Sequence, residues 1–222
     1  YKSYSIDGAD IATFTALSKH YAKDKNSVFY CDTYRESQNY YLTKRSTIFH
    51  IPDADPVSFI MLGDEYSPYA KDDKSAYLNG TGFPVKDVGS LELISGWFIK
   101  DKYQVYHGQK PVKGSDPGSF IILDQFFAKD NKQAYYYTFP SEGGVIPIVC
   151  NSASFTLLEY PYSKDANSVF YIDAIMDGVD ASTFSILGSA YSKDKNLVYH
   201  NDKKLSGADA ASFMVLAKDE AM

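Results

Sequence analysis

The sequence predicts a mainly β protein with short helical turns, built as an open array of about seven repeats of 29 residues. Three observations predict this fold. First, an aromatic residue, a spacer and Lys-Asp recur along the chain, and a small apolar residue and an aromatic one follow each Asp, as in residues 21–24 before Val28 and Phe29. Second, the string Asp or Asn, two residues, Ser or Thr, then Phe accompanies the first string. Third, short stretches rich in β-branched and aromatic residues lie between these landmarks. Repeats of this kind bury their apolar faces only against their neighbours, so the repeat determines the architecture.

The spacing of the Lys-Asp string defines the period. From Asp72 onward its aspartates are separated by 29, 29, 35 and 29 residues, which indicates a 29-residue unit with one six-residue insertion; they are Asp72, Asp101, Asp130, Asp165 and Asp194. The insertion falls within residues 137–149, where Pro and Gly residues indicate an extended loop. Asp24 marks an earlier copy, and residues 41–50 form a degenerate copy with Lys44 in place of the Asp.

The second string predicts a short helix or 3-10 turn in each unit. Asp or Asn at its first position is a preferred N-cap, and Pro56 and Pro117 occupy the next position, where a helix tolerates Pro. The Phe of the string and a Leu three residues later, such as Phe14 and Leu17, are expected to point inward.

The remaining residues of a unit predict two or three short antiparallel strands. Residues 196–200, Asn-Leu-Val-Tyr-His, are typical of a strand, and Asn79-Gly80 is typical of a tight hairpin turn. We expect one repeat domain over residues 1–222. A closed propeller is disfavoured, because 29 residues is short for a four-stranded blade.

The Lys-Asp string has two interpretations. Asp24 and Asn26 place two oxygen ligands two residues apart, as calcium loops do, but the next alternate residue is the apolar Val28 and other copies lack the Asn. The favoured interpretation is a turn, in which the Asp accepts backbone N–H groups, the Asn is left-handed and the Lys covers a neighbouring ring. No metal site is therefore predicted.

Other reactive residues fit the repeat better than a catalytic site. His50, His107 and His200 occupy a position that other copies fill with Tyr, so we interpret them as substitutes for a ring. Cys31 and Cys150 lie in different phases of the repeat without metal-ligand spacing, and are interpreted as two free buried thiols. The chain contains none of the nucleophile, zinc-protease or phosphate-loop motifs. We predict no enzymatic activity and no cofactor.

Composition and charge exclude further classes. The apolar fraction of 45% is typical of a folded protein, and the 20 Tyr and 14 Phe against one Trp indicate an aromatic core. A net charge of −6 without a basic face disfavours nucleic-acid binding. No apolar stretch approaches the roughly 20 residues of a membrane span, so none is predicted. The compartment stays open.

The repeated string also carries a family resemblance. Residues 21–30, Tyr-Ala-Lys-Asp-Lys-Asn-Ser-Val-Phe-Tyr, and residues 191–199, Tyr-Ser-Lys-Asp-Lys-Asn-Leu-Val-Tyr, resemble the DKNYY family of bacterial repeat proteins. The resemblance covers almost the whole chain. It implies an exported or envelope-associated protein and permits an immunity role beside a toxin, but it assigns no catalytic residue.

Two functions from different classes follow from these observations. The first is a non-enzymatic protein-binding module, with a toxin-neutralising immunity protein as one form, whose contacts lie where the repeat fails or varies. The candidate contact residues are Tyr34, Arg35, Tyr40, Lys44, Arg45, Trp97, Phe139 and Glu142. The second is a structural or envelope-associated scaffold. A hydrolase of carbohydrate or cell-wall material is a more distant alternative.

Overall fold

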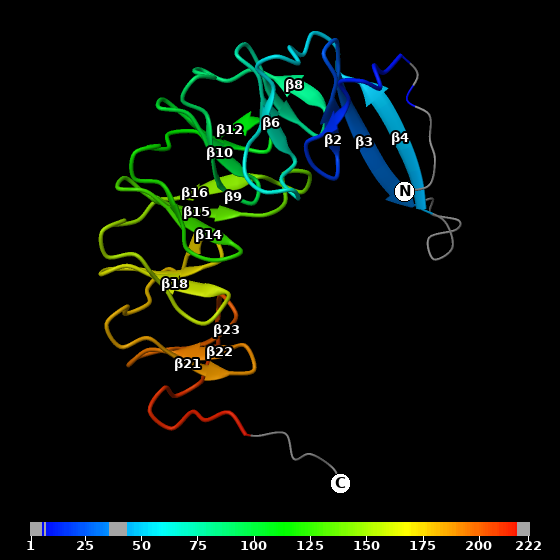
Figure 1. Cartoon of the computed structure of the whole chain (residues 1–222). Coiled ribbons are helices and arrows are strands. Elements are labelled where there is room, and N and C mark those ends of the chain that lie inside the picture. Colours follow the sequence, from blue (N-terminus) through cyan, green and yellow to red (C-terminus); the bar gives the residue numbers. More distant parts are fainter. Residues whose placement is uncertain (1–5, 7, 36–43, 217–222) are drawn as a thin grey trace. The chain divides into compact units, whose positions relative to one another are not determined.

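The chain folds into six antiparallel sheets of four strands each (Figure 1). The computed structural model describes residue 6 and residues 8–35 and 44–216, and these contain strands β1 to β24 and no helix. The chain divides into two compact units, residues 1–118 and residues 119–222, and each is described by itself. The predicted single repeat domain over residues 1–222 stays a prediction.

The first unit contains three sheets. They are β1 (Thr15–Ala16), β2 (Tyr21–Lys23), β3 (Val28–Arg35) and β4 (Lys44–His50); then β5 (Ile60–Met61), β6 (Tyr69–Lys71), β7 (Ala76–Leu78) and β8 (Thr81–Phe83); then β9 (Glu92–Ser95), β10 (Phe98–Lys100), β11 (Val105–His107) and β12 (Lys110–Pro111). In each sheet the spatial order of the strands follows the chain, so every sheet is a meander.

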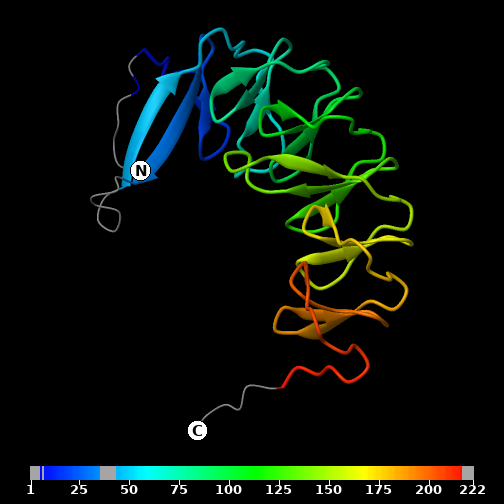
Figure 2. The same ribbon diagram turned by 180° about the vertical axis from the view of Figure 1, so that it is seen from behind.

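The second unit repeats this pattern three times (Figure 2). Its sheets are β13 (Ile121–Ile122), β14 (Phe127–Lys129), β15 (Ala134–Tyr137) and β16 (Val145–Ile148); then β17 (Thr156–Leu157), β18 (Tyr162–Lys164), β19 (Val169–Tyr171) and β20 (Ala174–Ile175); then β21 (Ser185–Gly188), β22 (Tyr191–Lys193), β23 (Val198–His200) and β24 (Lys203–Lys204). We name the four strand positions of any sheet a, b, c and d.

Each sheet has two chemically different ends. Strand b ends at the Lys of the Lys-Asp string, and the Asp lies in the turn from b to c; we call this the aspartate end. At the opposite end, which we call the hairpin end, a connects to b and c connects to d. Register is the same throughout: the first residue of b pairs with the third of c, as in Tyr21 with Tyr30 and Tyr69 with Leu78.

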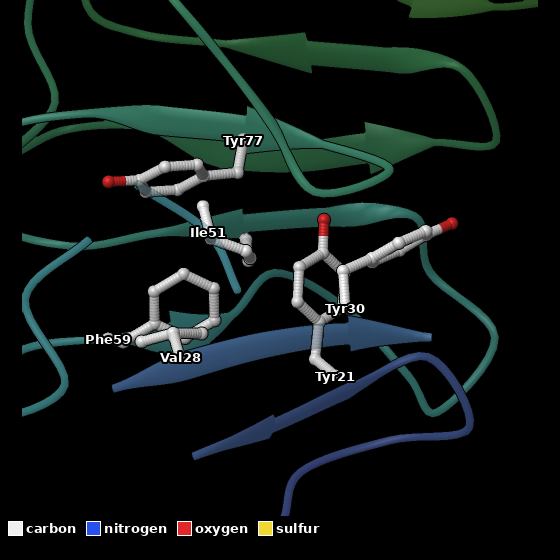
Figure 3. Packing of buried hydrophobic residues seen from close by; sticks show 7 residues of the cluster. Tyr21, Val28, Tyr30, Ile51, Phe59 and Tyr77 are labelled. Carbon is white, nitrogen blue, oxygen red and sulfur yellow. The ribbon is translucent and has the colours of Figure 1, made fainter. Parts of the chain in front are cut away.

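Aromatic side chains pack successive sheets of a unit together. Tyr21, Val28 and Tyr30 of the first sheet form one cluster with Phe59 and Tyr77 of the second (Figure 3). The ring centroids of Tyr21 and Tyr30 lie 4.9 Å apart in an edge-to-face arrangement. Burying such a side chain stabilises the fold by roughly 1.5–3 kcal/mol. This is the aromatic core that the composition predicts, distributed over the contacts between sheets.

The aspartate of the Lys-Asp string forms the predicted turn. In all six sheets its Oδ1 accepts the backbone N–H groups two and three residues later at 2.7–3.0 Å, as Asp72 does from Lys74 and Ser75. The predicted turn, in which the Asp accepts backbone N–H groups, is thus confirmed. The prediction that the Asn of this string is left-handed is wrong, because Asn26 does not have a positive φ.

The second carboxylate oxygen of the same aspartate joins the turn to other residues of the same repeat. Asp72 Oδ2 accepts the backbone N–H of Asp55 at 3.0 Å and the hydroxyl of Tyr77 at 2.7 Å. Bonds from the backbone N–H groups hold the pKa of Asp24 below its ordinary value, since they favour the charged form. The hydroxyl of the Ser or Thr in the second string accepts the backbone N–H that follows the aspartate in every sheet.

The lysine of the string has a different role from the predicted one. Instead of covering a ring, its ammonium donates to backbone carbonyls in the Asp-x-x-Ser/Thr-Phe segment that follows its sheet, as Lys23 does to Pro56 and Phe59 at 2.8 and 3.1 Å. The same bond forms from the other five lysines: Lys71, Lys100, Lys129, Lys164 and Lys193. Carbonyls at the end of a turn lack backbone partners, so they attract a cation more strongly than a ring does.

The predicted short helix is replaced by a single hydrogen-bonded turn. Asp55 caps the turn through its side chain, and the N–H of Phe59 reaches the Asp55 carbonyl at 3.0 Å, but Ile60 already begins strand β5. Five residues are too few to sustain a helix alone. Phe59 is buried as expected, whereas Phe14 and Leu216 are exposed, which corrects the prediction that every such Phe and Leu points inward.

The count of about seven repeats becomes six sheets. The degenerate copy at residues 41–50 does not form a sheet of its own, because strand β4 pairs with β3 and completes the first sheet. The six-residue insertion lies in the connection from β15 to β16. Each sheet also has four strands where two or three were expected, since positions a and d are mostly two-residue strands that a propensity pattern does not reveal.

Candidate functional site

The hairpin end carries different residues in each sheet. The residue before strand b accepts a backbone hydrogen bond from the residue after the third position of c in all six sheets, so its place is fixed. Its identity is not: these residues are His20, Pro68, Trp97, Phe126, Pro161 and Ala190. A fixed backbone with varied side chains is suited to presenting contacts, because substitution there leaves the ladder intact.

A cleft of about 510 Å³ opens at the hairpin end of the first unit. We call it the first cleft. All three sheets of the unit contribute to it, and its lining residues are His20, Tyr30, Asp32, Phe49, Tyr66, Pro68, Asn79, Gly96 and Trp97. Five of these carry an aromatic ring, and a concave, mainly aromatic surface with a few polar groups is typical of a binding site.

Aromatic contacts organise one wall of the first cleft. The ring of His20 is stacked on Tyr30 with centroids 5.8 Å apart, and the ring centroid of Phe49 lies 5.4 Å from that of Tyr30. The hydroxyl of Tyr30 donates to Asn79 Oδ1 at 3.1 Å. Burial raises the pKa of Tyr30 to about 12, so this hydroxyl keeps its proton at neutral pH.

Gly80 allows the second sheet to approach this wall. A Cβ at Gly80 would lie 2.7 Å from the Tyr30 side chain and 2.9 Å from Phe49, closer than real contacts allow. Asn79 and Gly80 both have positive φ, 49° and 73°, as the predicted Asn-Gly hairpin requires. The absence of a side chain at Gly80 therefore lets the tight turn pack against Tyr30 and Phe49, and Asn79 lines the first cleft.

The long hairpin of β3 and β4 supplies the side of the first cleft. Asp32 lies on β3 beyond the three residues of strand c that the other sheets share, whereas Phe49 on β4 pairs with Tyr30, the third of these residues. Phe49, from the degenerate copy of the repeat, thus contributes to a wall of the cleft. The departure of this copy from the repeat coincides with a structural feature that no other sheet of the first unit has.

Tyr66 and Trp97 line the cleft from the second and third sheets. Tyr66 is 63% exposed, and the ammonium of Lys19 lies 3.8 Å from the centroid of its ring. This cation–π contact joins the first sheet to the second. The hydroxyl of Tyr69 donates to the backbone carbonyl of Trp97 at 2.8 Å, which fixes the segment that carries the indole.

A second cleft, of about 350 Å³, occupies the equivalent place in the second unit. It lies at the hairpin end of the two sheets β17–β20 and β21–β24, and its lining residues are Glu159, Tyr160, Pro161, Tyr162, Tyr171, Ile172, Ile186, Gly188, Ser189, Ala190 and Asn201. Tyr171 holds the repeat position of Tyr30, and Asn201 that of Asn79. Each cleft also contains one carboxylate, Asp32 or Glu159.

Backbone strain collects at the rim of the second cleft. Ile172 has φ of 59°, although a β-branched residue is disfavoured in this region, and Ser189 and Ala190 are also left-handed at 51° and 67°. Residues held in such conformations are found preferentially at binding and catalytic sites. The strain therefore supports a functional interpretation of this rim.

Only one of the residues predicted as contacts lies in a cleft. Trp97 lines the first cleft. At the far end of the β3–β4 hairpin, Tyr34 pairs with Arg45 and Arg35 pairs with Lys44. The structure describes only the backbone of these four residues. Tyr40 lies outside the described residues.

The other two predicted contacts lie in the loop between β15 and β16. Phe139 and Glu142 are exposed there and do not line the second cleft. The candidate contact residues did not include His20, Tyr30, Asp32, Phe49 or Tyr66. The signal that pointed to His20 is the variation of the residue just before strand b, the position that Trp97 also holds.

All three histidines interpreted as ring substitutes pack against an aromatic ring. His107 and His200 lie at the third position of strand c, whereas His50 ends β4 and its ring centroid lies 6.0 Å from that of Phe29. His107 packs against Phe98 with centroids 4.4 Å apart, and burial lowers its pKa to about 4, because the charged ring loses hydration. His200 contacts Tyr191 at 4.9 Å. His50 Nε2 lies 3.1 Å from the Ser27 hydroxyl. Within the part of the chain that the structure describes, no group of three or more His, Cys, Asp or Glu could hold a metal ion.

Comparison with known families assigns the chain. The family model of the DKNYY family matches residues 33–171 and, in a second overlapping match, residues 86–203. The chain belongs to the DKNYY family. The match confirms the family resemblance. It includes residues 191–199 and most of the residues that line both clefts, and it begins after residues 21–30. Searches of curated proteins and of solved structures returned no significant match. Among the described residues, no helix is long and apolar enough to span a membrane.

Proposed function

We propose that the chain is a non-enzymatic protein-binding module that contacts its partner through the first cleft. The observation that carries this proposal is the convergence of five aromatic side chains from three sheets on one concave surface. Tyrosine and tryptophan supply large contact areas at a small entropy cost, and they dominate the energetics of protein interfaces. The rigid hydrogen-bonded frame at the aspartate end supports a preformed surface at the hairpin end.

The same lining disfavours the hydrolase alternative. Hydrolysis of a glycoside by the common mechanisms requires two carboxyl groups roughly 5–9.5 Å apart on either side of the bond. Among the residues that line the first cleft, Asp32 alone is a carboxylic acid. A binding function needs only one such group, placed to select the partner.

The scaffold alternative is supported by a different observation. Lysine-to-carbonyl bonds from each sheet to the segment that follows it, together with the aspartate turns, recur in all six sheets, as a structural spacer would require. A scaffold, however, does not need an aromatic cleft. We therefore propose that the hydrogen bonds of the aspartate end support a binding surface, and that toxin neutralisation is one form of this binding. Growth of cells that produce the partner, with and without this chain, tests that form.

Site-specific photo-crosslinking tests the binding proposal. Benzoylphenylalanine in place of Tyr66, at the rim of the first cleft, should capture a discrete protein partner in the cells that make the chain. The matched control is Tyr103, which is 57% exposed at the aspartate end of the third sheet and also carries a lysine over its ring. The same probe at Tyr103 should capture little of that partner.

The two positions separate the proposal from its alternatives. Equal capture at both positions would indicate contact without a preferred surface and would support the scaffold. Absence of any discrete adduct at position 66 would contradict binding through the first cleft.

A further inference from the structure

Two polar side chains of the first cleft, Asp32 and His20, present hydrogen-bond acceptors. Asp32 is exposed and carries a carboxylate. His20 Nδ1 lies 3.0 Å from the carbonyl oxygen of Cys31, so Nδ1 holds the proton of the neutral ring and Nε2 is an acceptor. A ligand that satisfies these groups must bring donors. A group that also favours aromatic faces is a cation with a flat, weakly hydrated surface.

The chain already places a cation on this surface. The Lys19 ammonium over the Tyr66 ring comes from the turn between β1 and β2, whereas Tyr66 precedes β6. The rim of the cleft therefore attracts a positive charge in the absence of a partner. An incoming cation would use the same ring or the neighbouring faces of Phe49 and Trp97, and it would be opposed by the charge of Lys19.

The second cleft repeats this chemistry in independent residues. Glu159 supplies its carboxylate, and the exposed ring of Tyr160 is positioned by Phe126 with centroids 4.7 Å apart. An aromatic face and one carboxylate thus recur at the hairpin end of both units, although Asp32 lies on strand c and Glu159 in the connection from a to b. The net charge of −6 adds a long-range attraction for a basic partner.

We propose that each cleft receives an arginine side chain of a basic partner protein, with the guanidinium lying against aromatic faces and donating to Asp32 in the first cleft and to Glu159 in the second. This inference rests on the proposed protein-binding function and specifies the chemistry of its partner. Arginine fits better than lysine because its planar group stacks on rings and forms two parallel bonds to a carboxylate.

Fluorescence of Trp97 tests the proposal in the intact chain. Trp97 is the only tryptophan and lines the first cleft, so its emission reports that site alone. The probe is acetyl-hexaarginine amide, and the matched probe is the same peptide with citrulline, which keeps the shape and removes the charge. We expect a saturable change with the arginine peptide and at least about tenfold weaker binding of the citrulline peptide.

Two substitutions with opposite expected effects on binding of the arginine peptide extend the test. Asp32→Asn should weaken binding of the arginine peptide about 5- to 10-fold, whereas Lys19→Ala should tighten it about 2- to 5-fold, because a competing cation is removed. Asp73→Asn is the control for the change in net charge, since Asp73 is exposed at the aspartate end. Its effect should stay within about twofold at physiological salt.

The second cleft is tested by calorimetry with the same peptide. Wild-type chain should bind at two sites, and Glu159→Gln should weaken one of them without changing the Trp97 response.

Three results would overturn the inference. They are equal binding of the arginine and citrulline peptides, weaker binding after Lys19→Ala, and a Trp97 response to a neutral glycan such as chitohexaose in place of the arginine peptide. None of them decides the protein-binding function itself, because crosslinking at Tyr66 reports on a partner of any chemistry.

Discussion

The two ends of each sheet differ in what repeats. At the aspartate end, the same Lys, Asp and Ser or Thr make the same bonds in all six sheets, as Lys71, Asp72 and Ser58 do in the second. At the hairpin end the backbone bonds persist but the side chains change, from His20 to Trp97. Repetition marks the residues that hold the fold, and variation marks the surface that is available for binding.

Removal of the Asp72 carboxylate tests whether the repeated residues of the aspartate end hold the fold, and it should have the largest effect on stability. This carboxylate is 2% exposed and accepts four hydrogen bonds, from the backbone N–H groups of Lys74, Ser75 and Asp55 and from the Tyr77 hydroxyl. Asp72→Ala leaves buried donors without a partner and should lower the free energy of unfolding by about 3–5 kcal/mol. Chemical denaturation measures this loss.

The neighbouring residue provides the control for that substitution. Asp73 is exposed, so Asp73→Ala should change the free energy of unfolding by less than about 0.5 kcal/mol. Similar losses for the two variants would contradict a special role for the buried carboxylate.

The pH dependence of stability tests the buried ring at the hairpin end. The unfolded chain protonates His107 near pH 6.5 and the folded chain only at about 4. The neutral ring therefore stabilises the fold fully above pH 6.5, and this contribution is lost as the pH falls from 6.5 to 4. Leu78 holds the position of His107 in the second sheet, so leucine fits there. His107→Leu should therefore flatten the pH dependence of stability between pH 6.5 and 4.

His200 serves as the matched position for this measurement. Its ring is exposed at the third residue of β23, so His200→Leu should leave the difference in stability between pH 6.5 and 4 unchanged. A profile that His107→Leu does not alter would contradict burial of that ring in neutral form.

Lys71 tests the connection between successive sheets. Its ammonium donates to the carbonyls of Val88, Gly89 and Leu91 at 2.9–3.2 Å. Lys71→Met keeps the apolar stem and removes the donor, so it should cost about 1–3 kcal/mol of unfolding free energy. Lys74→Met, at an exposed position two residues after Asp72, should cost less than about 0.5 kcal/mol. Equal costs would mean that the bond does not couple the sheets.

Much of the aspartate end could be predicted from the sequence, because its bonds are local. Asp24 Oδ1 and the two N–H groups that it binds lie within three residues, so the local sequence indicates the turn. The bond from Lys23 to Pro56 could not be predicted in this way, since it spans 33 residues and depends on how one sheet packs on the next. Strand β4 was missed because its pairing with β3 overrides the repeat pattern.

The first cleft was largely invisible to sequence reasoning for the same reason. His20, Asn79 and Trp97 belong to three sheets, and only their packing brings them to one surface. Irregularity of the repeat pointed to the correct hairpin, β3–β4, but to its far end. The residues that line the cleft, Asp32 and Phe49, lie nearer its base.

Ile172 allows the strain at the second cleft to be measured. Asn201 occupies the same hairpin position with φ of 54°, and Asn tolerates this region better than a β-branched residue. Ile172→Asn should raise the free energy of unfolding by about 1 kcal/mol, and Asn201→Ile should lower it by a similar amount. Thermal and urea unfolding of the two variants measure this pair. A loss of stability in Ile172→Asn would show that packing of the side chain outweighs the backbone strain.

The smallest change in stability is expected within the first cleft. Tyr66 is mostly exposed, so Tyr66→Ala should alter the free energy of unfolding by less than about 0.5 kcal/mol. It should nevertheless weaken partner binding, because aromatic anchors contribute more to interfaces than to the free protein. A large loss of stability would place Tyr66 in the frame and remove the contrast between the two ends.

The central claim is that the aspartate end holds the fold and the hairpin end binds. Its most direct test is the yield of partner crosslinked by benzoylphenylalanine at position 66, measured in the Asp32→Asn and Lys71→Met backgrounds at a temperature where both are folded. The account predicts that Asp32→Asn reduces the yield several-fold at unchanged stability, and that Lys71→Met lowers stability but keeps the yield. The reverse pattern, or equal loss of yield in both variants, would contradict it.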